Sequence, residues 1–462
     1  MADGLHGRER ALDLLESALA GSQADATEIL LLRDRTALTR FAKSEVHQNV
    51  FQDNTRVAVR AAVGRAMASV YVNSLEPGAL QKATERAASI ARLQAPDDNF
   101  AGLPQPDSGN PAGAEPPVSH FESTATQTPE ERARSLGDVF DSAREAGFEA
   151  FGAYRASEAE LAVVSTKGVR SYAGFTTAYL KVLVEGPDGT GFGDALDRDV
   201  TRINPVDVAA VAVDKCARNR EQAEIAPGEY EAVFEPNAVA DMLRFPAVWG
   251  FGARQVLDER SFLSGAVGTR VASEAVSIWD DANDPRCLPL AIDYEGIPAR
   301  RVDIVREGVA LGPVYDWKTA HEAGTRSTGH ASTPFTDFDS GPSANHVIMP
   351  VGDATADQLV SNVRNGVLVT RFHYTHCPDG KRVIATGTTR DGTFLIRDGV
   401  VVGALKNLRL EMGVLDMLSS LQESGRGKLC QDWWAMNGMA TQNYFVPAMR
   451  FGAVRFTGVT TF

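Results

Sequence analysis

A chain of 462 residues is too long for a single compact hydrophobic core, and it is long enough for two or three domains. Its 44% hydrophobic and 23% charged residues are typical of a globular protein and exclude fibrous or wholly disordered classes. Acidic residues outnumber basic residues 60 to 46, and a formal charge of −14 repels phosphate backbones, so no nucleic-acid partner is expected.

Cysteine spacing and hydropathy exclude two further classes, the secreted disulfide scaffold and the membrane protein. The four cysteines lie far apart without a CxxC pair, as in a reducing compartment. Residues 1–20 carry acidic residues among leucines and lack the apolar core of a signal peptide. No stretch approaches the ~20 apolar residues of a membrane helix. We therefore expect a cytoplasmic protein with no membrane partner.

Residues 1–110 are predicted to form an N-terminal α/β domain. The apolar residues of Glu9–Leu19 form one stripe and predict a helix, and a second helix with many alanines is expected over Leu80–Leu93. Four strands are expected between them: Ala26–Leu32, Thr36–Phe41, Val57–Val63 and Arg65–Tyr71. Proline, glycine and polar residues cluster from about 95 to 128 and predict a linker.

Residues 129–225 are predicted to form a middle α/β domain. A helix is expected over Pro129–Ala146, with Thr128 as its N-cap, and another within Ile203–Asn219. Three strands are expected between the helices: Phe148–Tyr154, Glu160–Ser165 and Arg170–Val184. This order of elements repeats that of the first domain, which is the pattern of a structural duplication.

Residues 226–462 are predicted to form a large, mainly antiparallel β domain with few helices, which makes the whole chain α+β. A strand over Glu229–Glu235 and a helix over Pro236–Leu243 open it. Short strands with glycine-rich turns follow, among them Val367–His373, Val383–Thr388, Thr393–Arg397 and Val400–Val402.

Several sequence blocks resemble those of the TldD/PmbA family, in the family's order and over almost the whole chain. They are Leu38–Ala42 with Val46–Asn49, Phe234–Ala240, Ser261–Leu263, Asp293–Gly296, Ser327–Ala331, Asn365–Thr370 and Thr386–Gly387. The resemblance implies a heterodimer. In it, a TldD-type subunit holds zinc on an HExxxH helix and a distant cysteine, and a TldE (PmbA) subunit lacks those ligands. Such pairs are implicated in proteolysis of unfolded or modified peptides and in maturation of peptide natural products.

The segment that matches the family's zinc helix carries no zinc ligand. Counting back from Ser261, Arg244 and Trp249 stand where the two histidines would be, and Phe245 stands where the glutamate would be. Zinc hydrolysis needs neutral imidazoles for the metal and a carboxylate to take a proton from bound water. A guanidinium stays protonated and repels a divalent cation. We therefore expect a degenerate metal site with no catalytic residue and no metal here, and zinc in the partner subunit.

Other polar groups give weaker signals. Ser327, Thr328 and His330 are expected to contact the cleft or a peptide, because the matching loop approaches the active centre in the family. His321 and His330 are nine residues apart, which does not fit a helical metal motif.

The segment from His373 to Cys377 is the one tight cluster of imidazole and thiol groups in the sequence. On a regular strand His373 and Thr375 would share one face and His376 would lie on the other. Cys430 lies in the region where the catalytic subunit carries its cysteine ligand, and it is expected to be a buried free thiol.

The sequence thus predicts a non-catalytic, zinc-free subunit, inactive alone. It would pair with a TldD-like zinc peptidase to form a chamber for proteolysis or maturation of unfolded or modified peptides. Two alternatives remain open. One is a stand-alone enzyme that uses His330, His373, His376 and Cys377. The other is a protein-interaction modulator of DNA gyrase, as the family's older name suggests. The sequence specifies neither the peptide nor the number of subunits.

Overall fold

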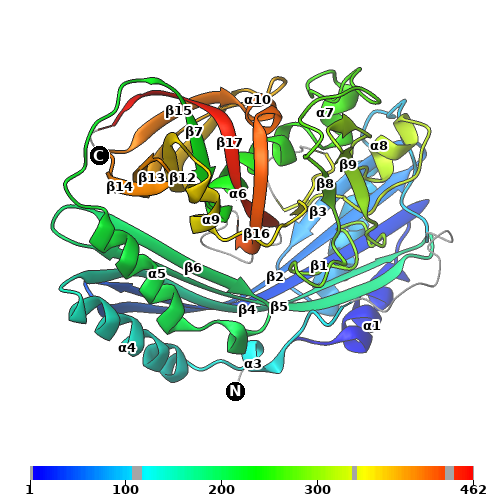
Figure 1. Cartoon of the computed structure of the whole chain (residues 1–462). Helices are drawn as coiled ribbons and strands as arrows, with labels where there is room; N and C mark the ends of the chain where they lie inside the picture. The colour runs from blue at the N-terminus through cyan, green and yellow to red at the C-terminus, as the bar shows by residue number, and fades with distance from the viewer. Residues whose placement is uncertain (1–3, 107–116, 336–340, 432–441, 461–462) are drawn as a thin grey trace.

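The protein has two layers, a long antiparallel sheet with helices on its outer face and a β domain on its other face (Figure 1). The computed structural model describes residues 4–106, 117–335, 341–431 and 442–460. The α+β class is confirmed. None of the helices in these ranges is both long enough and apolar enough to cross a membrane.

The first layer is a six-stranded sheet in the order β3-β2-β1-β4-β5-β6. Its strands are β1 (Ala26–Ala42), β2 (Glu45–Val63), β3 (Ala66–Val72), β4 (Glu149–Ser165), β5 (Arg170–Glu185) and β6 (Thr190–Asp197). β1 and β4 pair from Glu28 opposite Ser165 to Phe41 opposite Gly152. The two segments predicted as separate N-terminal domains therefore contribute three strands each to one continuous sheet.

Two breaks predicted within these strands are wrong. Ala26–Leu32 and Thr36–Phe41 belong to one strand, β1, and Phe148–Tyr154 and Glu160–Ser165 belong to β4. The charged residues between the two predicted segments of β1 form ion pairs within the sheet. Arg33 contacts Asp53 at 2.9 Å, and Asp34 contacts Arg56 at 2.5 Å. Paired charges are tolerated inside a strand because each satisfies its neighbour.

Helices cover the outer face of this sheet. They are α1 (Arg8–Leu19), α2 (Pro77–Ala91), α3 (Glu122–Ala125), α4 (Pro129–Glu145) and α5 (Pro205–Arg218), with a 3-10 turn at Val200–Arg202. The predicted cap of α4 is confirmed, because Thr128 accepts from the backbone N–H of Glu131 and the Glu131 carboxylate accepts from that of Thr128. The other face carries a hydrophobic cluster in which Leu161 and Phe175 pack with Tyr294 of the second layer.

The second layer is an eleven-stranded mixed sheet with short helices. Its main path is β10-β9-β8-β11-β17-β15-β13-β12-β7, and β7 also pairs with β17, so five strands close into a ring. The strands are β7 (Gly228–Phe234), β8 (Ile278–Asp280), β9 (Val302–Arg306), β10 (Val309–Ala310), β11 (His346–Ile348), β12 (Asn365–Asp379), β13 (Ile384–Arg397), β14 (Val400–Ala404), β15 (Leu408–Gly413), β16 (Leu421–Gln431) and β17 (Asn443–Val459). The helices are α6 (Pro236–Trp249), α7 (Ala253–Leu257), α8 (Trp317–Glu322), α9 (Ala356–Ser361) and α10 (Val414–Ser419).

Helix α6 is longer than predicted. It was expected to end at Leu243, yet it continues through Pro246 to Trp249. Pro246 has no N–H to donate back along the helix, but Phe245 is only 2% exposed in the largest hydrophobic cluster. Burial of this turn offsets the lost hydrogen bond. Helix α6 is therefore fixed against the core of the second layer.

Candidate functional site

One face of α6 looks toward the junction of the two layers. Asn237, Asp241, Arg244 and Val248 follow one another at spacings of four, three and four residues, so they share a stripe of the helix. Asn237 and Asp241 line a cavity there. The Asp241 carboxylate also accepts a hydrogen bond of 2.8 Å from the backbone N–H of Phe372 on β12, which fixes its orientation.

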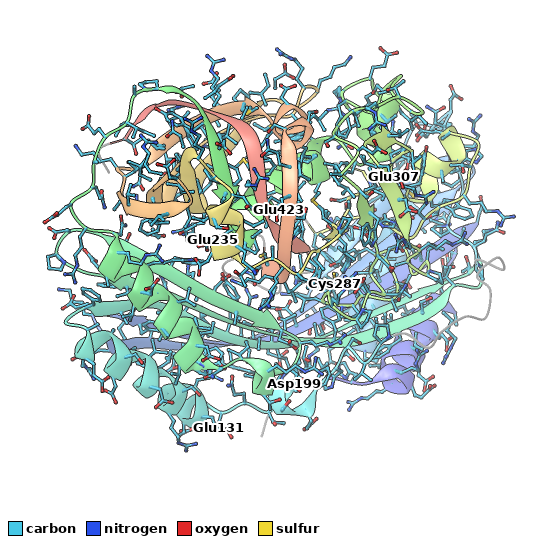
Figure 2. All side chains as sticks on the ribbon, viewed as in Figure 1. Glu131, Asp199, Glu235, Cys287, Glu307 and Glu423 are labelled. Carbon is cyan, nitrogen blue, oxygen red and sulfur yellow. The ribbon has the colours of Figure 1, made fainter. Side chains whose placement is uncertain are left out.

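This interlayer cavity has a volume of about 410 Å³ and is bounded by both layers. Arg40, His47 and Lys181 line it from the six-stranded sheet, and Asp241 and His373 line it from the second layer. Burial lowers the pKa of Lys181, and the neighbouring Arg371 and Arg40 guanidiniums lower it further. Figure 2 shows side chains filling the junction between the layers, with Glu235, the residue that precedes α6, close to it. A cavity of this size suits a segment of a peptide.

A buried ion pair closes one side of the interlayer cavity. Lys428 on β16 forms an ion pair with Asp194 on β6. Asp194 also accepts hydrogen bonds from Asn237, at 2.9 Å, and from the Tyr179 hydroxyl, at 3.2 Å. Burial raises the pKa of Asp194, but the Lys428 ammonium and these hydrogen bonds outweigh burial and leave it below its ordinary value. The network joins both layers to the start of α6.

Cys430 lies on the same network as a buried thiol. Its Sγ is 3.0 Å from Oδ1 of Asn237, to which the S–H donates. Burial raises the pKa of this thiol well above its ordinary value, so the group is protonated at neutral pH. The prediction of a buried free thiol is confirmed. A metal-binding cysteine needs the thiolate form, which this environment disfavours.

The three residues of the predicted degenerate metal site do not converge on one point. The Phe245 side chain packs into the core. The Arg244 guanidinium is partly buried and lies over the Phe245 ring, 5.9 Å from its centroid. Trp249 is 43% exposed and lies beside Gly380. Across the described ranges no group of three or more His, Cys, Asp and Glu could hold a metal ion.

The loop with Ser327, Thr328 and His330 does not line the interlayer cavity. His330 is 4% exposed, and its Nε2 lies 2.9 Å from the Asp280 carboxylate. Thr328 Oγ1 accepts a 2.7 Å hydrogen bond from the Tyr315 backbone, and Ser327 lines a separate cavity of about 280 Å³. Contact of this loop with a peptide stays a prediction.

The prediction that His373 and His376 lie on opposite faces of a strand is wrong. A β-bulge at Tyr374, whose φ is +53°, adds one residue to β12. His373 therefore lies opposite Thr388 and His376 opposite Thr386, and directly opposed residues share a face. Cys377 does not join them, because its Sγ lies 3.4 Å from the Asp379 carbonyl and burial raises its pKa to about 11.

Sequence reasoning missed the residues from the first layer that complete the site, above all Lys181, Tyr179 and Asp194. No motif marks them, and they lie at least 43 residues before Asn237 in the chain. Asp241 could have been found, because it precedes Arg244 by three residues and so lies on the same face of the predicted zinc helix.

Two family models match the chain. The PmbA/TldA metallopeptidase C-terminal domain matches residues 227–458, and PmbA/TldA metallopeptidase domain 1 matches residues 27–91. A metalloprotease from Methanothermobacter thermautotrophicus is 26% identical over 198 residues, which span 43% of each chain. A metalloprotease TldD homolog from Haemophilus influenzae is 23% identical over 407 residues, covering 79% of this chain and 78% of that one. The match to the archaeal relative thus spans less than half of that protein.

Solved structures share the fold over nearly the whole chain. TldE from Thermococcus kodakarensis has a TM-score of 0.84 at 23% identity, covering 96% of this chain and 99% of that one. A protein from Thermotoga maritima described as a modulator of a DNA gyrase has a TM-score of 0.81 at 17% identity, with the same coverage. The C-terminal family domain covers half of the chain, and the chain belongs to the PmbA/TldA (TldD) metallopeptidase family.

Proposed function

We propose that this chain is the non-catalytic, zinc-free subunit of a two-component metallopeptidase, paired with a TldD-like subunit that carries the zinc. The observation that carries the proposal is the composition of α6. By the count from Ser261, Arg244, Phe245 and Trp249 are predicted to stand at the positions of the family's zinc motif, and Phe245 packs into the core. No histidine or glutamate follows Glu235 as far as Leu257, so a shift of register does not supply ligands.

The chain contributes walls to a chamber for unfolded or modified peptides. The interlayer cavity supports this role because Asn237 and Asp241 of α6, the helix that corresponds to the family's zinc helix in this proposal, are among its lining residues. Its lining mixes cations such as Lys181 and Arg40 with the carboxylates of Asp194 and Asp241, which suits the polar backbone of an extended peptide. Binding an extended segment selects for unfolded substrates, which are degraded or matured at the partner's zinc.

Trp249 is the residue of α6 best placed to meet the partner. It ends the helix and is 43% exposed, although it is a large aromatic residue. Tryptophan is favoured at interface hot spots, where one side chain buries a large area. We place this interaction in the cytoplasm, in keeping with the four unpaired cysteines.

The test is co-expression of this chain with a TldD-like subunit, followed by sizing, zinc quantification and a peptidase assay. We expect one zinc per heterodimer, retained by the partner, and no zinc or activity in this chain alone. Trp249→Ala should weaken pairing about tenfold or more, whereas Leu93→Ala, a control at an 86% exposed residue, should leave it unchanged. Stoichiometric zinc together with peptidase activity in the isolated chain would overturn the proposal.

The two alternatives make different predictions in the same preparation. A stand-alone enzyme requires His330, His373, His376 and Cys377 to act together, so alanine at each position should abolish activity. We expect activity of the complex to survive His330→Ala and Cys377→Ala, because His330 is buried against Asp280, the Cys377 sulfur contacts the Asp379 carbonyl, and neither residue lines a cavity that His373 lines. A gyrase modulator should co-purify with gyrase subunits, whereas we expect a TldD-like polypeptide.

A further inference from the structure

A second cavity, of about 630 Å³, lies over β12, β13 and β15. The side chains that line it include two guanidiniums, Arg390 and Arg409, and two imidazoles, His373 and His376. No carboxylate is among its lining residues in the ranges that the structure describes. In a chain with a formal charge of −14, a cavity whose charged lining residues at neutral pH are two arginines is a local reversal of charge.

The strand register brings these groups to one face of the sheet. His373 lies opposite Thr388, and Thr388 lies opposite Arg409, which places the three in one row. His376 lies opposite Thr386 in the next row. Arg390 is two residues along β13 from Thr388, a diagonal neighbour of Arg409, and such neighbours are about 7–8 Å apart. Both guanidiniums can reach one anion at that separation. The bulge in β12 is what brings His376 onto this face.

The two arginines of this cavity form few ion pairs with carboxylates of the same chain. Arg390 approaches Asp391 at 3.8 Å, but the Asp391 carboxylate is already held by Arg371 at 2.6 Å. Arg409 makes no ion pair with any residue in the described part of the chain. Glu411 shares the face of Arg409, two residues further along β15, but it lies outside the cavity lining.

A buried hydroxyl group completes the site. Thr386 is 7% exposed and lines the cavity, and its Oγ1 has no hydrogen-bond partner among the described residues. A buried hydroxyl without a partner costs free energy, so such groups are normally satisfied by the protein or by a ligand. The Thr386 hydroxyl can donate to an anion that the guanidiniums attract.

We propose that this second cavity binds a carboxylate of the peptide substrate, from either the chain terminus or an acidic side chain. Guanidinium groups bind carboxylates through paired charge-assisted hydrogen bonds, and the volume suits one or two residues. His373 lines both this cavity and the interlayer cavity, so a peptide anchored here extends toward α6. That the cavity binds a carboxylate is argued from its lining residues alone. That this carboxylate belongs to a peptide substrate rests on the proposed function.

The experiment measures binding of rhodamine-labelled hexapeptides to the purified full-length chain by fluorescence anisotropy. The probes are an uncharged apolar peptide with a free C-terminal carboxylate, the same peptide as its amide, and the amide with a glutamate as last residue. We expect the free acid to bind about tenfold or more tightly than the amide. If the glutamate amide alone binds tightly, the side chain is the source of the carboxylate and the site stands. Equal affinity for all three probes overturns the inference.

Variants assign the binding to this cavity. Arg390→Gln with Arg409→Gln should abolish the difference between acid and amide, whereas Arg364→Gln, at an exposed arginine elsewhere in the domain, should preserve it. Thr386→Val removes only the unpartnered hydroxyl. It should weaken acid binding severalfold without lowering the melting temperature, which separates binding from folding. Unchanged discrimination in the double variant overturns the assignment.

Failure of the carboxylate cavity can be distinguished from failure of the proposed pairing. An active, zinc-containing heterodimer without carboxylate discrimination refutes the cavity and leaves the pairing intact. Carboxylate discrimination in a chain that pairs with no TldD-like subunit refutes the pairing and leaves the cavity intact.

Discussion

Replacing Lys428 with methionine should loosen the junction between the two layers, because it leaves the Asp194 carboxylate buried without its cation. Asp194 belongs to β6 of the first layer, and its side chain is only 4% exposed. Lys428 belongs to β16 of the second layer. After the change Asp194 keeps only the hydrogen bonds from Asn237, at 2.9 Å, and Tyr179, at 3.2 Å. Two neutral donors do not replace an ammonium group.

The magnitude follows from the burial of the two partners. Removing one member of a fully buried ion pair costs about 3–5 kcal/mol. The Lys428 side chain is 35% exposed, so water screens part of the interaction. We therefore expect Lys428→Met to lower the free energy of unfolding by about 2–3 kcal/mol. Asp194→Asn should lower the free energy of unfolding by about 1 kcal/mol, because the Lys428 ammonium can still reach water. The double variant should lose less free energy of unfolding than the sum of the two single variants.

The assay is urea unfolding followed by tryptophan fluorescence and circular dichroism, with the first transition analysed. Lys406→Met is the matched control, because its pair with Glu224 is exposed and should contribute at most about 1 kcal/mol. The pKa of Asp194 is lowered in the folded state, so its contribution is complete above the ordinary value of 3.8. This contribution to the free energy of unfolding is lost as the pH falls through the pKa that Asp194 has in the folded state. The stability of Asp194→Asn should therefore not show this fall. A Lys428→Met variant within 0.5 kcal/mol of the wild type (about the additivity error), or additive single changes, would refute the reasoning.

Three further changes test other parts of the structure. Gly152→Ala should lower the free energy of unfolding by about 3 kcal/mol, measured by urea unfolding, because φ is +153° and the new Cβ would lie 2.0 Å from the Lys181 carbonyl oxygen. His330→Gln should lower the free energy of unfolding by about 2 kcal/mol below pH 6.5, measured by urea unfolding at several pH values. Because Asp280 raises the pKa of His330, that cost should shrink as the pH rises through the folded pKa, and a cost independent of pH would contradict this. Phe245→Glu should cost about 4 kcal/mol or more, whereas Phe245→Leu should cost less than about 1.5 kcal/mol, both read from melting curves.

The fold was predictable where local signals agree with tertiary structure. The start of α4 followed from Thr128 and Glu131, whose side chains form the capping box. The length of β1 was not predictable, because the charged residues Arg33 and Asp34 interrupt the apolar pattern and their partners on β2 cannot be read from the sequence. The end of α6 was missed for a related reason, since Pro246 normally terminates a helix and only the burial of its neighbours overrides it.

The candidate site was predictable only on α6. The match of Arg244, Phe245 and Trp249 to the family's zinc motif stays a prediction from counting along the sequence, whereas the cavity depends on which residues the first layer brings opposite α6. Asp194 reaches Asn237 through the packing of two layers, which no spacing rule encodes. The second cavity depends on the bulge at Tyr374. A regular strand would place its two histidines on opposite faces, so the sequence alone argued against the arrangement that the structure has.

Helix α6 presents one face to the hydrophobic core and another to the interlayer cavity. The face with Phe245 is part of the core, and a glutamate there would bury a charge with no partner. On the proposed function, restoring the family's motif would therefore require a glutamate at position 245 that destabilises the core, in addition to two histidines. The face with Asn237 and Asp241 lines the interlayer cavity and is held by hydrogen bonds to β6 and β12. Arg244 belongs to the cavity-facing stripe, but the hydrogen bonds from Asn237 to Asp194 and from the Phe372 backbone to Asp241 do not involve it. On the proposed function, loss of the metal ligands therefore leaves these contacts of the cavity wall in place.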